Sequence, residues 1–345
     1  MSLYSDEQVR ALEFCTYCPR LCHFACPSAH GDGSEASTAW GLMSLANHVR
    51  KGELAPDAHL AAQLYHCTAC GRCTEFCVHG NDVPSLIRLA RGAAADACGV
   101  PEPIRRTIDD LCPTPAASSA PEPHGVVLAL GCETLAALSP NALDALQRLL
   151  TQLLEADVTL ASALQVSCCG DIATRGGDAT RAESARHTSR HALMNAGLVL
   201  SDCGGFSKIC DGEVVSLYDE LARHAESLRR LSSALPRRNM VLHGACHARR
   251  TLASEAAERT ILDAIGVDVI DLPAIDNNPD CCGAEAMYRA TTKDGAKRAA
   301  MALDVPHGAA LISSSVRCAA HLAEARDEPV TSLVHLVLTR CGELV

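Results

Sequence analysis

The cysteines of this chain are the residues whose spacing indicates chemistry most directly. Four of them stand within eleven residues, with two, two and three residues between successive thiols: Cys67, Cys70, Cys73 and Cys77. Three thiolates spaced this closely can ligate three corners of one [4Fe-4S] cluster, whereas a fourth that is displaced by an extra residue ligates a different cluster. A second run of cysteines must therefore complete both clusters.

The second run lies upstream and consists of Cys15, Cys18, Cys22 and Cys26. In proteins with two such clusters, each run gives its fourth cysteine to the other cluster. We therefore predict two ligand groups, named here the Cys15 set (Cys15, Cys18, Cys22 and Cys77) and the Cys67 set (Cys67, Cys70, Cys73 and Cys26). Three residues separate Cys18 from Cys22, and Val78 stands where a proline is usual. Both departures bear on the geometry of the Cys15 set.

Zinc is the alternative metal for these runs, because closely spaced pairs of cysteines also occur in zinc sites. A structural zinc ion needs four ligands, which usually come from two pairs that are well separated in sequence. A run of four thiols exceeds what one ion needs, so the spacing favours iron–sulfur clusters.

The composition places this chemistry in a reducing compartment. The chain has 345 residues, of which 20 are cysteine, and its formal net charge is −11. Its first residues are polar and acidic and no apolar run is long enough to span a bilayer, so we expect a cytoplasmic protein without a signal peptide. Clustered cysteines then indicate metal or redox chemistry rather than disulfides. The acidic charge and an aromatic content of 3% argue against nucleic-acid binding.

Helix signals dominate the first part of the chain. We predict a two-[4Fe-4S] ferredoxin-type domain at residues 1–98, with helices that begin at Ser34, Asp57 and Pro84. Residues 99–124 are rich in Pro, Ala and Ser and are predicted to be a linker that contains one short helix.

Beyond the linker the sequence repeats itself, and the predicted halves are residues 125–238 and 239–345. Three landmarks recur at spacings of 113 to 115 residues: Cys132 with Cys246, Cys168-Cys169-Gly170 with Cys281-Cys282-Gly283, and Cys203 with Cys318. Landmarks in register indicate a duplication.

Each half alternates short β-branched runs with amphipathic segments, which predicts parallel strands joined by crossover helices. Loops at the carboxyl ends of such strands gather in one crevice, where we expect Cys132, Cys203 and Cys246. The predicted fold is therefore α/β with an α-helical N-terminal part: a helical two-cluster domain followed by a duplicated α/β domain with small parallel sheets.

A lone cysteine, then Cys-Cys-Gly, then another cysteine, found twice, resembles the cysteine-rich CCG domain of heterodisulfide reductases. The same domain occurs in iron–sulfur subunits of anaerobic glycerol-3-phosphate, glycolate and lactate dehydrogenases. A ferredoxin unit followed by two CCG halves looks like the heterodisulfide reductase chains in which these two parts are fused, and the resemblance covers nearly the whole chain. It implies metal ligation, as a cubane or noncubane [4Fe-4S] cluster or as zinc, by eight residues: Cys132, Cys168, Cys169, Cys203, Cys246, Cys281, Cys282 and Cys318.

Neither half keeps the full family motif, which ends in CxxC and supplies five cysteines. The first half has Phe206 in place of the last cysteine, and Cys210 lies too far along a helix to replace it comfortably. In the second half His321 follows Cys318 by three residues and shares its helix face, so we include His321 as a candidate ligand. A redox-active disulfide within each Cys-Cys pair is disfavoured by ring strain.

These features predict an iron–sulfur electron-transfer subunit of an oxidoreductase complex, with no catalytic residue of its own. We expect a flavoprotein dehydrogenase subunit as partner, because the chain has no nucleotide motif and flavin must come from another chain. A membrane cytochrome or another redox subunit is a further expected partner, which would recruit the chain to the inner face of the membrane. The alternative is a catalytic reductase of the heterodisulfide type that acts at a CCG-bound cluster.

Overall fold

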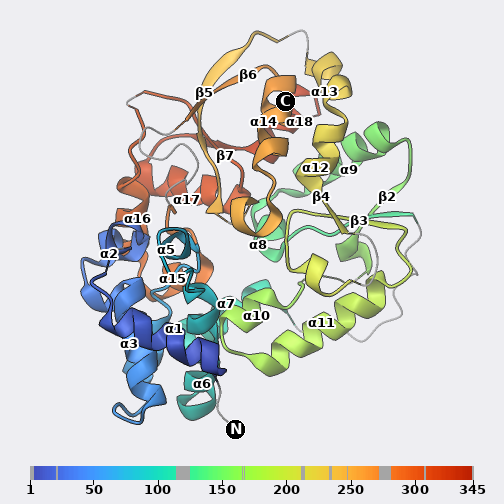
Figure 1. Cartoon of the computed structure of the whole chain (residues 1–345). Coiled ribbons are helices and arrows are strands. Elements are labelled where there is room, and N and C mark those ends of the chain that lie inside the picture. Colours follow the sequence, from blue (N-terminus) through green and yellow to red (C-terminus); the bar gives the residue numbers. More distant parts are fainter. Residues whose placement is uncertain are drawn as a thin grey trace. The chain divides into compact units, whose positions relative to one another are not determined.

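The computed structural model describes residues 4–20, 22–113, 125–164, 166, 168–210, 214–232, 235–246, 248–271, 281–306 and 308–343. The chain forms two compact units, each of which is described by itself (Figure 1). The N-terminal unit comprises Met1–Asp110, Ile172–Ala182 and Asp280–Leu303, and the sheet unit comprises Leu111–Asp171, Glu183–Pro279 and Asp304–Val345. Two segments from the predicted CCG halves thus belong with the N-terminal residues.

The N-terminal unit is built from helices, as predicted. They are α1 (Asp6–Tyr17), α2 (Pro27–Asp32), α3 (Ala39–Arg50), α4 (Ala58–Leu64), α5 (Arg72–Glu75), α6 (Val83–Cys98), α7 (Glu102–Leu111), α10 (Asp171–Arg175), α15 (Ala286–Thr291) and α16 (Lys293–Met301), with 3-10 turns η1 (His23–Ala25) and η2 (Glu35–Ser37). Helix α7 lies inside the predicted linker and buries Ile104 and Ile108. The rest of that linker, residues 114–124, lies outside the described residues.

Side-chain caps fix where these helices begin. Asp57 caps α4 and Asp82 caps α6, each by accepting a hydrogen bond from a backbone N–H three residues further on. Helix α3 begins after Thr38, whose hydroxyl oxygen accepts a hydrogen bond from the N–H of Gly41. The predicted start at Ser34 was wrong, because the three residues after Ser34 first form η2.

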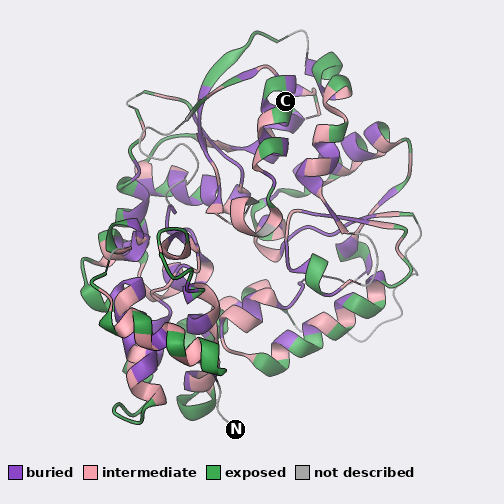
Figure 2. Cartoon of the chain, in the orientation of Figure 1, coloured by how far each residue is buried: buried purple, intermediate pink, exposed green. Residues whose placement is uncertain are grey.

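Apolar residues at helical spacing form the core of the N-terminal unit. Its buried members include Leu12, Leu42, Met43, Leu64, Leu86 and Ile87. Helix α1 packs on α3 and α4 packs on α6, and Figure 2 shows α3 largely buried. Cysteines of both sets lie against this core: Cys15, Cys22, Cys67 and Cys73. The core therefore fixes the backbone that carries them.

Two adjacent glycines let the segment after α10 pack closely within the N-terminal unit. Gly177 has a φ of +81°, and a Cβ there would lie 3.0 Å from the carbonyl oxygen of Arg91 in α6. A Cβ on Gly176 would overlap the side chain of Ile108. The Tyr65 hydroxyl donates a hydrogen bond to the carbonyl oxygen of Gly176 at 2.8 Å. The glycine pair thus serves close backbone approach.

Helices α15 and α16 join the same unit through α2. The Tyr288 hydroxyl donates a hydrogen bond to Asp32 Oδ1 at 2.9 Å, and Arg298 Nε donates one to the carbonyl oxygen of Gly31. A Cβ on Gly31 would overlap the carbonyl oxygen of Gly295 and the Tyr288 hydroxyl. Position 31 therefore has no room for a side chain.

The sheet unit holds two four-stranded sheets in which every strand pair is parallel. The first has the order β2-β1-β3-β4 and the second the order β6-β5-β7-β8 (Figure 1). The strands are β1 (Val126–Leu128), β2 (Val158–Leu160), β3 (Leu198–Ser201), β4 (Val214–Ser216), β5 (Arg238–His243), β6 (Val267–Asp271), β7 (Leu311–Ser313) and β8 (Val330–Ser332). The two orders are the same, which confirms the predicted duplication and the α/β fold.

Strand pairing fixes which residues of the two halves are equivalent. In the first sheet Val127 pairs with Val199, and in the second Val241 pairs with Leu311. Val241 follows Val127 by 114 residues, whereas Leu311 follows Val199 by only 112. The halves therefore match with an offset of 114 at β1 and β5, and of 112 at β3 and β7.

This register corrects one predicted landmark. An offset of 112 places Cys318 at the position of Phe206, and Ser315 at the position of Cys203. Cys203 and Cys318, matched by residue type in the sequence, are thus not equivalent, because backbone pairing sets the register. The first half keeps the first cysteine of the CxxC pattern and the second half keeps the last.

Helices and short helical turns cover the two sheets. They are α8 (Cys132–Ala137), α9 (Pro140–Leu154), α11 (Ala179–Leu193), α12 (Leu217–Arg223), α13 (Ala225–Ser232), α14 (Glu255–Ala264), α17 (Val316–Arg326) and α18 (Leu333–Arg340), with turns η3 (Ala161–Leu164), η4 (Phe206–Lys208) and η5 (Ala248–Leu252). One buried cluster contains residues from both sheets, including Leu128, Leu200, Leu242 and Ile312. Figure 2 shows that α11 keeps one exposed face.

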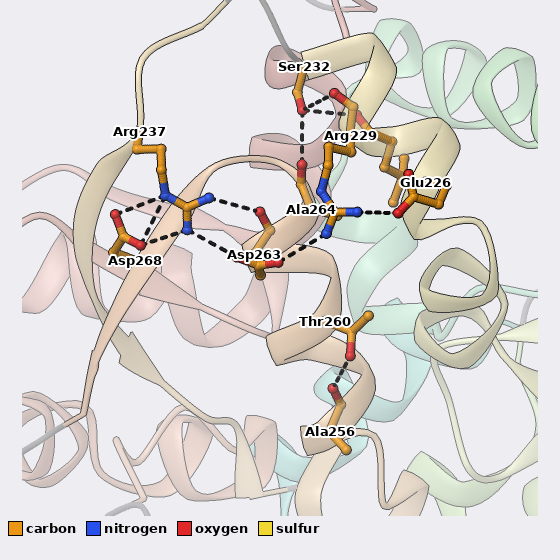
Figure 3. Close-up of polar contacts among 10 residues, drawn as sticks. Glu226, Arg229, Ser232, Arg237, Ala256, Thr260, Asp263, Ala264 and Asp268 are labelled. Atoms are coloured by element: carbon orange, nitrogen blue, oxygen red, sulfur yellow. Dashed lines mark hydrogen bonds and ion pairs between the residues drawn. The ribbon is translucent and has the colours of Figure 1, made fainter.

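An exposed ion network ties the start of β5 to its neighbours (Figure 3). Arg237 Nη2 lies 2.6 Å from Asp268 Oδ1 and 3.1 Å from Asp263 Oδ1, and Arg229 bridges Asp263 to Glu226. Because solvent screens exposed pairs, we expect this network to add little stability. No helix in the described part of the chain is both long and apolar enough to cross a membrane.

Candidate iron–sulfur and metal sites

The structure brings the four thiols of the Cys15 set together in the N-terminal unit. Cys15 lies in the last turn of α1, Cys18 caps that helix, Cys22 precedes η1 and Cys77 follows α5. Burial raises the pKa of the Cys15 thiol to about 11, and the other three thiols of the set raise that pKa further. All four thiols and Cys73 line a cavity of about 510 Å³. A cavity whose wall carries these thiols fits a bound cluster.

The thiols of the Cys67 set are likewise gathered. Cys26 precedes α2, Cys67 follows α4, Cys70 is buried before Gly71, and Cys73 lies on α5. Burial raises the pKa of Cys67 to about 12 and that of Cys73 well above its usual value, and neighbouring thiols of the set add to both shifts. Such thiols stay protonated until a metal replaces their protons, so metal binding would release protons.

Positive backbone φ angles shape the loop that presents the Cys67 set. Ala69 has a φ of +52° and Gly71 one of +75°. The Ala69 N–H lies 3.3 Å from Cys67 Sγ, to which it donates a hydrogen bond. A backbone N–H group that donates to sulfur stabilises the negatively charged thiolate form of the ligand.

Asn81 is a neighbour of the Cys15 set that the sequence did not predict. Its Nδ2 donates hydrogen bonds to Cys15 Sγ and to the carbonyl oxygen of Ala11, both at 3.2 Å. The hydrogen bond to sulfur lowers the pKa of Cys15 and opposes the effect of burial. No spacing rule marks Asn81, since its contact with Cys15 is made across the fold.

The first CCG half gathers its four cysteines at the carboxyl ends of β1 and β3, as expected for Cys132 and Cys203. Cys169 Sγ lies 3.7 Å from Cys203 Sγ. Hydrogen bonds that the Cys132 and Cys169 thiols donate to Cys168 raise the pKa of Cys132 well above its usual value and that of Cys169 to about 12. The four sulfur atoms thus form a continuous chain of contacts within the sheet unit.

Small residues and a buried carboxylate hold these cysteine loops. A Cβ on Gly205 would overlap Cys169 Sγ, and one on Gly131 would lie 3.2 Å from Cys203 Cβ. Asp202 accepts hydrogen bonds from the Gly131 N–H at 2.7 Å and the Thr134 hydroxyl at 2.5 Å. The loops after β1 and β3 are therefore tied together.

The 3.7 Å separation of Cys169 Sγ and Cys203 Sγ is compatible with two thiolates that share one ion. Zn–S bonds of about 2.3 Å in a tetrahedral site place sulfur atoms about 3.8 Å apart. The donor set is four thiols, which also satisfies a [4Fe-4S] cluster. Iron and zinc thus both fit the chemistry of the first half, and its metal stays a prediction.

The cysteines of the second half are divided between the units. Cys246 and Cys318 lie in the sheet unit, whereas Cys281 and Cys282 are buried in the N-terminal unit. Cys281 Sγ donates a hydrogen bond to Thr68 Oγ1 at 3.7 Å. Since Thr68 directly follows Cys67, the second cysteine pair lies against the loop of the Cys67 set.

His243 is a second residue near a predicted ligand that sequence reasoning missed. It ends β5, is fully buried, and its Nδ1 lies 3.0 Å from Ser313 Oγ. A ring nitrogen of His243 lies within 4.8 Å of Cys318 Sγ. Burial lowers the pKa of His243, which favours the neutral, metal-binding form. The sequence feature that could have identified His243 is that a histidine stands at the position where the first half has Ala129.

Two further residues that the sequence analysis considered are His321 and Cys210. His321 is buried on α17, one turn after Cys318, and Cys210 is partly exposed after η4. The role of His321 as a ligand stays a prediction, and Cys210 was not predicted to be one.

Protein-family models match both parts of the chain. Residues 11–81 match the 4Fe-4S dicluster domain. Residues 126–205 and 240–323 each match the cysteine-rich domain named CCG. A comparison with curated proteins and one with solved structures returned no match.

The class of the protein follows from these matches and the fold. It is an iron–sulfur protein that joins a 4Fe-4S dicluster domain to a duplicated cysteine-rich domain. The chain therefore has the architecture of the family that contains the fused heterodisulfide reductase chains and the iron–sulfur subunits of anaerobic dehydrogenases. This confirms the resemblance read from its cysteines.

Proposed function

We propose that this chain is the electron-transfer subunit of an oxidoreductase complex. It relays electrons between a flavoprotein dehydrogenase subunit and a downstream acceptor. Bound [4Fe-4S] clusters would supply one-electron oxidation and reduction, and the Cys15 and Cys67 sets would hold them. The protein's own part is to bind and space the clusters and to exclude water from them.

The contact between Thr68 and Cys281 carries this proposal. It connects the loop of the Cys67 set to a cysteine of the second CCG half inside one compact unit. A protonated Cys281 thiol donates to the Thr68 hydroxyl, whereas a Cys281 thiolate can only accept, so the hydroxyl would then turn and become the donor. The contact can therefore persist when Cys281 ligates a metal.

The cysteine pattern supports a relay over a catalytic reductase of the heterodisulfide type. Cleaving a substrate disulfide at a cluster requires an open coordination position and a full ligand set. In the first half Phe206, which is 1% exposed, fills the place of one CxxC cysteine, and in the second half Ser315 replaces the other. Neither half supplies five thiols.

The partners follow from what the chain lacks in its sequence. With no nucleotide-binding motif it would receive electrons from, or pass them to, a flavin on another subunit. A membrane cytochrome or similar redox subunit is the proposed second partner, and contact with it would bring the chain to the cytoplasmic face of the membrane.

Variants at Thr68 test the proposal. Anaerobically prepared, metal-loaded protein would be mixed with limiting dithionite and followed by rapid-freeze EPR. We expect Thr68→Val to slow electron arrival at the second-half metal roughly tenfold, because the hydroxyl bridge is lost. The matched control Thr68→Ser keeps the hydroxyl and should stay near the wild-type rate. Equal rates in all three proteins would contradict the part that this contact plays in the relay.

A further inference from the structure

Arg91 is a buried cation beside the Cys67 set. It lies on α6 and is 2% exposed. Its guanidinium donates hydrogen bonds to the carbonyl oxygens of Leu64 at 3.0 Å, Cys67 at 2.6 Å and Arg175 at 3.1 Å. These contacts hold the charge directly behind the loop that presents the Cys67 set.

All partners of this guanidinium in the described part of the chain are neutral. Three are backbone carbonyls, and the fourth is the Tyr65 ring, whose centroid lies 4.8 Å from the guanidinium carbon. Burial raises the pKa of Tyr65 to about 12, and its hydroxyl donates to Gly176, so this ring carries no charge at neutral pH. Among the described residues no carboxylate forms an ion pair with Arg91.

A buried charge without a counter-charge is costly, and proteins rarely keep one. The anion available to Arg91 is the thiolate group of the Cys67 set, whose Cys67 carbonyl it already contacts. Four thiolates around a [4Fe-4S] core give a net negative charge, which grows by one unit when the core is reduced. The cation is thus stabilised most when a cluster is bound and reduced.

The Cys15 set has a different environment. The neutral amide of Asn81 donates a hydrogen bond to Cys15. Arg20, which lines the same cavity as these thiols, is exposed and paired with Glu35. Among described residues of the N-terminal unit, the buried arginines are Arg72 and Arg91, and Arg72 stands between Cys70 and Cys73. Buried positive charge is therefore concentrated at the Cys67 set.

We propose that Arg91 is the counter-cation of the cluster held by the Cys67 set, and that its field makes this cluster the more easily reduced of the two. The inference rests on the proposed function and adds the order in which the two clusters pass electrons. One electron leaves the reduced cluster of the Cys15 set and enters the oxidised cluster of the Cys67 set, with no proton or ligand transferred. Electrons therefore settle on the cluster whose loop contacts Cys281.

Redox titration of the loaded full-length protein, followed by EPR, measures both midpoint potentials. A unit charge at about 10 Å in a medium of effective dielectric 20 changes a one-electron equilibrium roughly tenfold, which is about 59 mV. We expect Arg91→Gln to lower the potential of one cluster by that amount and leave the other unchanged. Arg91→Lys keeps the charge and should keep most of the potential. Because Arg91 is buried, the shift should not depend on ionic strength.

Asn81→Leu assigns the signals and serves as the matched control. It removes the hydrogen bond to Cys15 and should lower only the potential of the cluster held by the Cys15 set. In the wild-type protein the cluster whose potential responds to Asn81→Leu must be the one of lower potential. This comparison needs no Arg91 variant, so it tests the inference even if Arg91→Gln does not fold.

The outcomes separate this inference from the proposed function. Two clusters with the Asn81-sensitive one higher in potential, or with equal shifts of both clusters in Arg91→Gln, would overturn the role of Arg91 and leave the relay intact. Protein with no [4Fe-4S] signal after anaerobic reconstitution would overturn both.

Discussion

Cys318 follows the end of β7 by the same number of residues as Phe206 follows the end of β3. The pairing of β7 with β5 and of β3 with β1 sets this equivalence, and Ser315 then corresponds to Cys203. Matching hydrogen bonds support it: Gly131 N–H donates to Asp202 at 2.7 Å, and Ala245 N–H donates to Ser314 at 2.7 Å. The two halves have thus lost different members of one CxxC pair.

Ser315→Cys should restore the missing thiol of the second half. Serine and cysteine differ little in size, and position 315 is partly exposed before α17. We expect the new thiol to resist alkylation by iodoacetamide in metal-loaded protein and to react after chelation. Ser216→Cys, another helix-capping serine that is partly exposed, is the matched control and should react in both states. Free reaction of position 315 in loaded protein would count against the register.

Gly205→Ala should displace Cys169 and empty the metal site of the first half. The backbone at position 205 is right-handed helical, so alanine is not strained there, but its Cβ would overlap Cys169 Sγ. We expect a loss of metal at this site and a destabilisation of roughly 1–3 kcal/mol, measured by metal analysis and denaturant unfolding. Gly92→Ala, which meets open space in α6, should keep the metal and stabilise by about 1 kcal/mol. Equal metal content and equal stability of the two variants would argue against the close packing of position 205 on Cys169.

Glu258 should make the protein less stable as the pH rises. It is 1% exposed, accepts a hydrogen bond from Ser254 at 2.9 Å, and burial raises its pKa from 4.5 to about 7. The folded state therefore holds a proton that the unfolded state loses, so the free energy of unfolding falls between about pH 4.5 and 7 and is flat above that. The full change is roughly 3 kcal/mol.

Glu258→Gln keeps the shape and removes this titration. Denaturant unfolding at several pH values should show the variant more stable than wild type at pH 8 and about equally stable at pH 4. A difference that does not change with pH would contradict the raised pKa of Glu258.

Tyr288→Phe should loosen the attachment of α15 and α16 to α2. The Tyr288 hydroxyl donates to Asp32 at 2.9 Å, and its loss leaves a mostly buried carboxylate with one donor fewer, at a cost of about 1–3 kcal/mol. Hydrogen exchange should rise in α15 and α16. Tyr218→Phe loses a hydroxyl that donates to Ser314 inside the sheet unit, so its exchange should rise there instead. Unchanged exchange in α15 and α16 would refute the attachment.

Local signals in the sequence predicted much of the fold. The cap at Asp57 and the proline Pro84 in the first turn of α6 lie where expected. These features depend on a few neighbouring residues, and the same is true of the spacing that groups the cysteines. The parallel sheets followed from alternation alone.

Features made by distant contacts could not be predicted. Nothing local tells that Gly176 and Gly177 pack within the N-terminal unit, or that Cys281 meets Thr68, 213 residues away. Arg91 had a visible signal, since it continues the buried stripe of α6 one turn after Ile87. A charged residue on an apolar helix face implies a specific partner, but only the fold shows which one.

The most direct test of the central claim is the content of iron, acid-labile sulfide and zinc per chain in anaerobically purified protein. Two clusters on the Cys15 and Cys67 sets predict at least about eight iron atoms and about eight sulfides, with an EPR signal on reduction. Iron well above eight would place a further cluster in the CCG halves. Zinc without acid-labile sulfide would contradict the account, because a chain without clusters cannot relay electrons.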